Sequence, residues 1–186
     1  DLVSRFGDFQ FPLRAPDEDV VVGMGNSAPL AWTGDLADLP EEGWDWAFAQ
    51  AVEDHAAGRT PTIQCALQIA LPPASQGRGV SRLMVQAMRH IGAAHGFRQL
   101  IAPVRPSAKS RYPLTSMDRY VEWTTTEGLP FDPWLRVHAR LGARIVKVCH
   151  RAMTIAGSSA QWEQWTGLRF PDSGPYIVPG ALNPVD

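Results

Sequence analysis

The sequence has little cysteine and no long apolar run, and both absences narrow the class of the protein. Only two cysteines occur in 186 residues, Cys65 and Cys149, and each lies in an apolar segment. This usage favours two buried thiols over a disulfide or a metal pair, so we expect a cytoplasmic location and no bound metal. No stretch of about 18 apolar residues and no signal-like N-terminus occurs, so we expect no membrane span.

The chain also lacks an excess of either charge. Its formal net charge of -2 gives no overall attraction to nucleic acid or to an anionic membrane, so we expect neither as a partner. Any basic binding site must therefore be local. A hydrophobic content of 45% with 19% charged residues is typical of globular proteins, and 186 residues fit one domain over residues 1–186.

Apolar periodicity predicts alternating strands and helices, which is typical of the α/β class. Strands are expected at residues 2–13, 19–25, 62–71, 99–104, 143–148 and 152–156. Helices are expected at residues 40–57, 80–96, 117–123, 133–141 and 160–166. Residues 170–186 are rich in proline, and we expect an ordered arm that packs on the domain or on a second copy, the latter giving a homodimer.

A glycine-rich loop separates the strand at 62–71 from the amphipathic helix at 80–96. Its sequence is Gln76-Gly77-Arg78-Gly79, and the two glycines allow the backbone to turn several N–H groups into one concavity. The helix that follows adds its unpaired first-turn N–H groups and the positive end of its dipole. The loop therefore predicts an anion site, and we expect the anion to be a phosphate.

Two common phosphate loops do not match this stretch. A Walker loop ends in Gly-Lys-Ser/Thr, but no lysine follows Gly77 or Gly79. A dinucleotide fold needs a third glycine, where this chain has Arg82, and an acid after the next strand, where it has Arg105. An ordinary tight turn between strand and helix is the remaining alternative.

The stretch resembles the coenzyme A loop of the GCN5-related N-acetyltransferases (GNATs), whose pattern is Q/R-x-x-G-x-G/A after a strand ending in V-x-P. Here Leu71-Pro72-Pro73 ends the strand and Gln76–Ser81 follows, with Ser81 in place of the last glycine or alanine. The resemblance implies acetyl-CoA as the cofactor. It implies coenzyme contacts from Ile69, Leu71, Gln76, Gly77, Arg78, Gly79, Val80, Ser81 and Arg82.

A second segment resembles the family's last helix, which ends as F-Y-x-x-x-G-F. Val137-His138-Ala139-Arg140-Leu141-Gly142-Ala143 has the same spacing, with His138 where the family has the tyrosine that protonates the departing thiolate. An imidazole can serve as that acid, because its ordinary pKa of about 6.5 lies near working pH. The alternative is a structural histidine packed on the sheet.

The resemblance spans residues 62–148 and implies a fold and a reaction. The fold is a mixed, mostly antiparallel sheet with flanking helices and a central, splayed pair of parallel strands that holds the coenzyme. The reaction is direct transfer of an acetyl group to a small-molecule amine, without a covalent enzyme intermediate. A coenzyme A-binding sensor or interaction domain without activity is the alternative.

The sequence does not identify the general base. The family often carries a carboxylate on the strand before the loop, but residues 62–71 contain none. Asp45, between Trp44 and Trp46, could be a base with a raised pKa or a solvent-facing acid in the first turn of a helix. Glu122 and Asp132 are weaker candidates, and Arg105, Lys109 and Arg111 are candidates for binding the coenzyme's ribose phosphate.

Overall fold

The computed structural model describes residues 2–16 and 19–186, which form two compact units. The first contains the chain up to Pro103 together with Arg151–Met153. The second contains Val104–His150 and Thr154–Asp186. A single domain over residues 1–186 stays a prediction.

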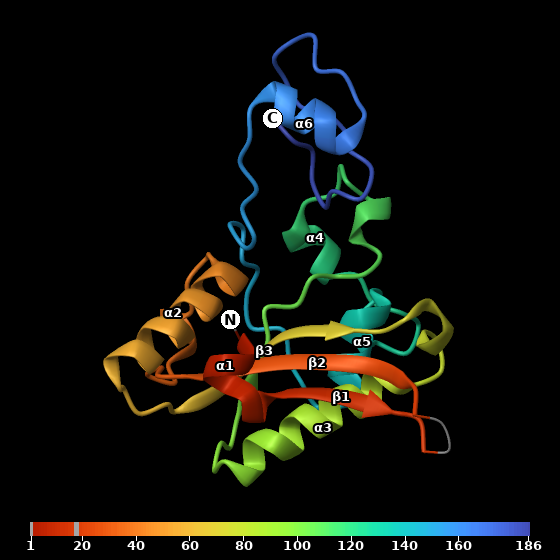
Figure 1. Ribbon diagram of the computed structural model, residues 1–186. Helices are drawn as coiled ribbons and strands as arrows, with labels where there is room; N and C mark the ends of the chain where they lie inside the picture. The colour runs from red at the N-terminus through yellow and green to blue at the C-terminus, as the bar shows by residue number, and fades with distance from the viewer. Residues whose placement is uncertain (1, 17–18) are drawn as a thin grey trace. The chain divides into compact units, whose positions relative to one another are not determined.

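The first unit is a sheet with flanking helices (Figure 1). Its elements are α1 (Leu2–Phe6), η1 (Gly7–Phe9), β1 (Gln10–Arg14), β2 (Val21–Leu30), η2 (Leu36–Asp38), α2 (Gly43–Ala57), β3 (Ile63–Ala70), η3 (Pro73–Ser75), α3 (Val80–Ala94) and β4 (Leu100–Ile101). The strand order is β1-β2-β3-β4, antiparallel between the first three and parallel between β3 and β4. The predicted α/β class with a mixed, mostly antiparallel sheet is confirmed.

Helix α3 packs very closely on the sheet, alongside which it runs in Figure 1. A Cβ added to Gly23 on β2 would lie 2.9 Å from the Met84 sulfur, and one added to Gly25 would lie 3.2 Å from the Met84 methyl. On the helix side, a Cβ at Gly92 would lie 2.0 Å from the Gln64 side chain on β3. These glycines have ordinary negative φ, so it is the close approach, not the backbone conformation, that requires them.

The core of the first unit lies between the sheet and the helices. Buried apolar residues come from the N-terminal turns and from β2, α2 and β3, including Phe6, Phe9, Ala28, Leu30, Ala47, Ala51, Ile63, Cys65 and Leu67. Phe6 and Phe9 are three residues apart, so a helical turn directs both to the core. This explains why residues 2–9 are helical rather than part of the predicted strand.

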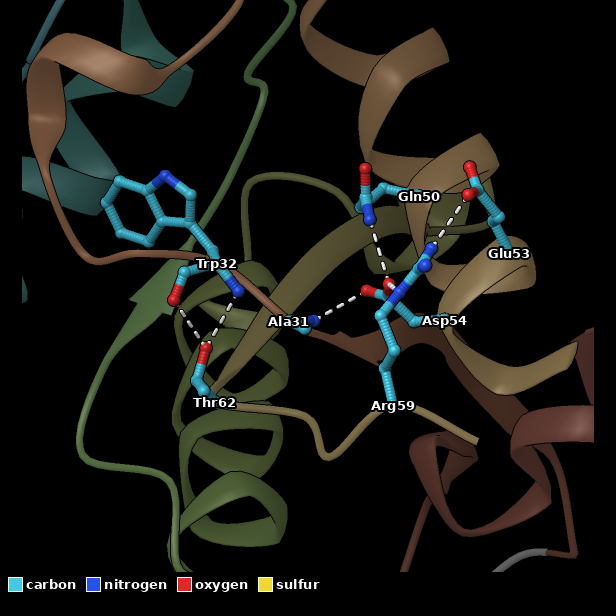
Figure 2. A network of polar contacts seen from close by, with 7 residues as sticks. All are labelled: Ala31, Trp32, Gln50, Glu53, Asp54, Arg59 and Thr62. Atoms are coloured by element: carbon cyan, nitrogen blue, oxygen red, sulfur yellow. Dashed lines mark hydrogen bonds and ion pairs between the residues drawn. The ribbon is translucent and has the colours of Figure 1, made fainter. Parts of the chain in front are cut away.

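A buried carboxylate fixes the C-terminal end of α2 (Figure 2). Asp54 is 1% exposed and accepts hydrogen bonds from the Ala31 N–H (2.6 Å), Gln50 Nε2 (2.8 Å) and Arg59 Nε (2.6 Å). Burial alone would raise the pKa of Asp54, but these hydrogen bonds outweigh burial and hold the pKa below its ordinary value. Gly58, with φ of +65°, ends the helix as the sequence predicts.

The second unit consists of short helices and loops. Its helices are η4 (Lys109–Arg111), α4 (Met117–Val121), α5 (Pro133–Arg140) and α6 (Ser159–Thr166). Asp132 caps α5 and is 1% exposed. Its carboxylate accepts hydrogen bonds from the N–H groups of Ser107, Ala108, Trp134 and Leu135 and from the Tyr120 hydroxyl.

Lys109 ties the C-terminal arm to this unit. It is fully buried, and its Nζ donates to the carbonyl oxygens of Tyr112 (3.1 Å) and Leu182 and to Asn183 Oδ1 (3.4 Å). Burial lowers the pKa of Lys109, and none of these acceptors carries a negative charge that would offset this effect. Val178 on the arm is buried as well, whereas Ile177 is half exposed.

Several predicted strands are wrong. Residues 143–148 and 152–156 form none, and the chain is exposed from 143 to 147, so no buried face fixes a sheet register there. The parallel pair therefore lies at the edge of the described sheet rather than at its centre, and β4 is shorter than predicted. Cys65 is buried as expected, whereas Cys149 is only half-buried.

Asp54→Asn should lower the free energy of unfolding by about 2 kcal/mol at pH 7, because it replaces a charged acceptor by a group that also carries N–H donors. The lowered pKa stabilises the fold above the unfolded-state pKa of about 3.9, and this contribution is lost as pH falls through the folded-state pKa. The difference between wild type and variant should therefore shrink below about pH 4. Urea denaturation at pH 7 and pH 3 measures both effects.

Glu53→Gln is the matched control, because Glu53 pairs with the same Arg59 at 2.8 Å but has a side chain that is 69% exposed. That variant should change the unfolding free energy by less than about 1 kcal/mol. Equal effects of the two substitutions would show that burial of Asp54 is not what stabilises the end of α2.

Candidate functional site

The glycine loop has the conformation that an anion site requires. Pro73–Ser75 form a 3-10 turn, Gln76 is extended, and Gly77 and Gly79 have φ of +71° and +80°. A Cβ added to either glycine would meet nothing within 4 Å. Both positions therefore need glycine for their left-handed backbone and not for lack of space, and the loop surface is open.

The backbone N–H groups at the start of α3 are available to a ligand. The N–H groups of Arg82 and Leu83 donate to the Gly79 carbonyl (3.1 and 3.4 Å). In the described part of the chain, those of Gly77 to Ser81 donate no hydrogen bond. Five consecutive amides at the positive end of a helix dipole favour a phosphate group.

The loop is fixed at both ends. Gln76 Nε2 donates to the Leu71 carbonyl at the end of the strand (3.2 Å). Below the loop, Met84, Val85 and Met88 of α3 are buried against the sheet. Arg78 and Arg82 are exposed beside the free amides and can add positive charge to the site.

The strands next to the loop separate. β3 pairs with β4 only at Gln64↔Leu100 and Cys65↔Ile101, yet β3 continues to Ala70. Ala66 and residues 68–70 therefore have partners in β2 but none on the β4 side within the described residues. An unpaired strand edge that ends at an anion-binding loop suits an elongated ligand with a phosphate at one end and hydrogen-bonding groups along its length.

Helix α2 contacts the same strand. β3 has a register shift between Asn26↔Gln68 and Ser27↔Ala66, which leaves Leu67 as an extra residue in a β-bulge. The Trp44 indole Nε1 donates to the Leu67 carbonyl (2.8 Å). The helix start with half-buried Asp45 is thereby held at β3. The sequence gives no signal for this contact, because Trp44 reads as an ordinary apolar helix residue.

The predicted site residues fall in both units. Ile69, Leu71 and the loop 76–82 belong to the first unit and lie on one continuous segment, and Asp45 belongs to the same unit. His138 belongs to the second unit, where it is half-buried and its ring lies 4.3 Å from that of Trp134. Its Nε2 is enclosed without a hydrogen-bond partner among the described residues, and burial lowers its pKa below the ordinary value.

Four weaker candidates make contacts outside the glycine loop. The Asp132 carboxylate caps α5, and although burial favours its neutral form, its many hydrogen bonds lower its pKa, so it cannot serve as a base near neutral pH. Lys109 is buried among its own acceptors and cannot reach a phosphate. Glu122 is an exposed acid 3.9 Å from Arg119. Exposed Arg105 donates to the Gly180 carbonyl (2.8 Å).

Other site types find no support in the described residues. No group of three or more His, Cys, Asp or Glu side chains among them could hold a metal ion. Within 2–16 and 19–186, no helix has the length and apolar character needed to cross a membrane. A surface pocket of about 390 Å³ lies between Phe6, Pro29 and Arg59, but none of its lining residues belongs to the glycine loop.

No protein-family model matches the chain. A curated relative, Arginine N-acetyltransferase avaD from Aspergillus versicolor, is 34% identical over 177 residues. The match includes 89% of this chain but only 60% of the length of that relative. The chain therefore spans less than two thirds of the protein it resembles.

Two solved structures share the fold. The loading GNATL domain of CurA from Lyngbya majuscula superposes with a TM-score of 0.61 at 21% identity, covering 77% of this chain and 67% of that domain. The GphF GNAT-like decarboxylase, in complex with isobutyryl-CoA, gives a TM-score of 0.52 at 16% identity, covering 81% of this chain and 76% of that protein. Both likenesses concern the fold alone.

Proposed function

Because the chain belongs to the GNAT superfamily, we propose that it is an acyl-CoA-dependent N-acyltransferase that transfers acetyl from acetyl-CoA to a small-molecule amine. The observation that carries the proposal is the left-handed Gly77 and Gly79 loop, with five free amides at the N-terminus of α3. Arginine is the first acceptor to test, since a relative 34% identical to this chain is named an arginine N-acetyltransferase.

The reaction needs no covalent enzyme intermediate. The amine nitrogen attacks the thioester carbon, a C–N bond forms as the C–S bond breaks, the amine loses a proton and the thiolate gains one. The free edge of β3 supports a role for backbone N–H groups in polarising the thioester carbonyl. The loop residues 76–82, with Ile69 and Leu71, would bind the coenzyme.

For proton transfer we propose two residues. Asp45 would accept the amine proton, directly or through water, and its position at the end of α2 that contacts β3 supports this role. His138 would protonate the departing thiolate, supported by its spacing from Gly142 and by an enclosed imidazole nitrogen without a partner in the described part of the chain. A cytoplasmic location and a homodimer stay predictions.

The test of the proposal is an assay of acetyl-CoA turnover with arginine and a panel of other small amines, in which the release of free coenzyme A thiol is measured. We expect turnover that depends on the amine. One observation favours the alternative of a coenzyme-binding domain without activity, namely that β3 carries no carboxylate. Binding of coenzyme A without turnover by any amine would support that alternative, and failure to bind coenzyme A would contradict both.

Gly79→Asp should raise the Kd for coenzyme A by about tenfold or more, because it places a carboxylate where the pyrophosphate would bind. Gly79→Asn is the matched control, because the asparagine side chain has nearly the same shape as aspartate but no charge. Asparagine also tolerates the positive φ of +80° at this position. Isothermal titration calorimetry should show a much smaller effect for asparagine. Equal Kd values for wild type and the aspartate variant would contradict a pyrophosphate site at this loop.

His138→Phe should lower kcat by about 10²- to 10⁴-fold if the imidazole is the general acid, with the Kd for coenzyme A unchanged. The ratio of wild-type to variant kcat across pH 5 to 8 reports the role of the imidazole, because the effect of pH on the amine cancels. Burial lowers the pKa of His138, so an acid should give a ratio that falls as pH rises, from a pH below about 6.5 onward.

A ratio that rises with pH would instead assign His138 as the base. A ratio that does not depend on pH would leave it the structural role of packing on Trp134.

A further inference from the structure

The indole of Trp44 donates a hydrogen bond to the bulged residue of β3. In the bulge of β3, Leu67 stands opposite no residue of its own on β2, because Asn26 pairs with Gln68 and Ser27 pairs with Ala66. Leu67 is only 8% exposed, so an unpaired carbonyl there would be costly. Trp44 Nε1 donates to this carbonyl at 2.8 Å.

The geometry of the indole is itself fixed. Trp44 stacks on Phe48, one turn further along α2, with ring centroids 5.4 Å apart and planes 11° from parallel. A stacked, half-buried ring on a helix has little rotational freedom, so the donor stays directed at Leu67. The bulge is therefore held from outside the sheet by a rigid side chain.

The Leu67 bulge lies next to the point at which β3 loses its β4 partner. Pairing between β3 and β4 ends at Cys65↔Ile101, two residues before Leu67. Residues 68–70 follow the bulge and lead to Leu71 and the glycine loop. A shift of the strand register by one residue at the bulge would turn every later side chain and N–H group of this strand to the other side.

We propose that Trp44 is a positioning residue of the transfer reaction: its indole N–H holds the Leu67 bulge, and the bulge sets the register in which residues 68–70 present the free edge of β3 to the acyl end of the donor. This rests on the proposed acyltransferase function. The indole takes no part in proton transfer and does not touch the reacting atoms. Its effect on the rate acts through the backbone of β3.

Replacement of Trp44 by β-(benzothienyl)alanine tests the role most directly, because sulfur replaces the N–H while the shape and the stacking on Phe48 are kept. Trp44→Phe is the genetically simple second variant. Both should lower kcat by about tenfold, the size expected for loss of one hydrogen bond that orders the site, with the Kd for coenzyme A within about twofold of wild type. Amide hydrogen exchange of residues 68–70 should become faster in both.

Trp32 provides the matched control. Its indole Nε1 is buried but has no hydrogen-bond partner among the described residues, and the residue lies outside the proposed site. Trp32→Phe and its benzothienyl counterpart should leave kcat and the exchange of residues 68–70 unchanged. All assays are run well below the unfolding midpoint of each variant, so that a loss of stability does not lower the rate.

The outcomes separate this inference from the proposed function. An unchanged kcat in the benzothienyl variant of Trp44 overturns the positioning role, as does a fall in kcat that the Trp32 control reproduces. Should wild type bind coenzyme A without turning over any amine, the proposed function fails. The exchange rates then decide alone, and unchanged exchange at residues 68–70 overturns the role of Trp44 in holding the bulge.

Discussion

The close contact between α3 and the sheet is the constraint on which the first unit depends. Gly23, Gly25 and Gly92 have no room for a side chain. The space next to them is filled by Met84 and Leu71 at Gly23, by Phe11 and Met84 at Gly25, and by Gln64 at Gly92. A helix held this closely has a fixed N-terminus, and its first-turn amides keep one direction without any ligand. The glycine loop can then be open and polar, since its geometry is set by the packing below it and by the Gln76 contact with Leu71.

The two buried carboxylates have structural roles. Asp54 and Asp132 are each 1% exposed and each accept several hydrogen bonds, which lower their pKa values against the opposing effect of burial. Such groups stay ionised and cannot exchange protons near neutral pH. In the proposed reaction, neither Asp54 nor Asp132 can therefore serve as the base for the amine.

The sequence predicts the parts of the fold that depend on local signals. Gly58, Gly96 and Gly142 end helices with positive φ, Asp132 caps α5, and the uncharged run before the loop is β3. Prediction from the sequence fails where tertiary contacts determine the local structure. Residues 143–147 have the composition of a strand but no partner strand in the described ranges 2–16 and 19–186. Lys109 looks like a surface cation but is buried, with hydrogen bonds to the C-terminal arm. The Trp44 contact with Leu67 depends on a bulge that no local pattern marks.

In the proposed reaction, the absence of a carboxylate from β3 changes what the rest of the protein would have to contribute to catalysis. If no strong base lies on the strand, the rate has to come from holding the amine and the thioester in attack geometry and from backbone N–H groups on the free edge of β3. Both effects are sensitive to small displacements of the backbone. In the proposed reaction, the bulge and the helix N-terminus lie at the two ends of the short segment from Leu67 to Val80, and together they would set the position of the thioester relative to β3.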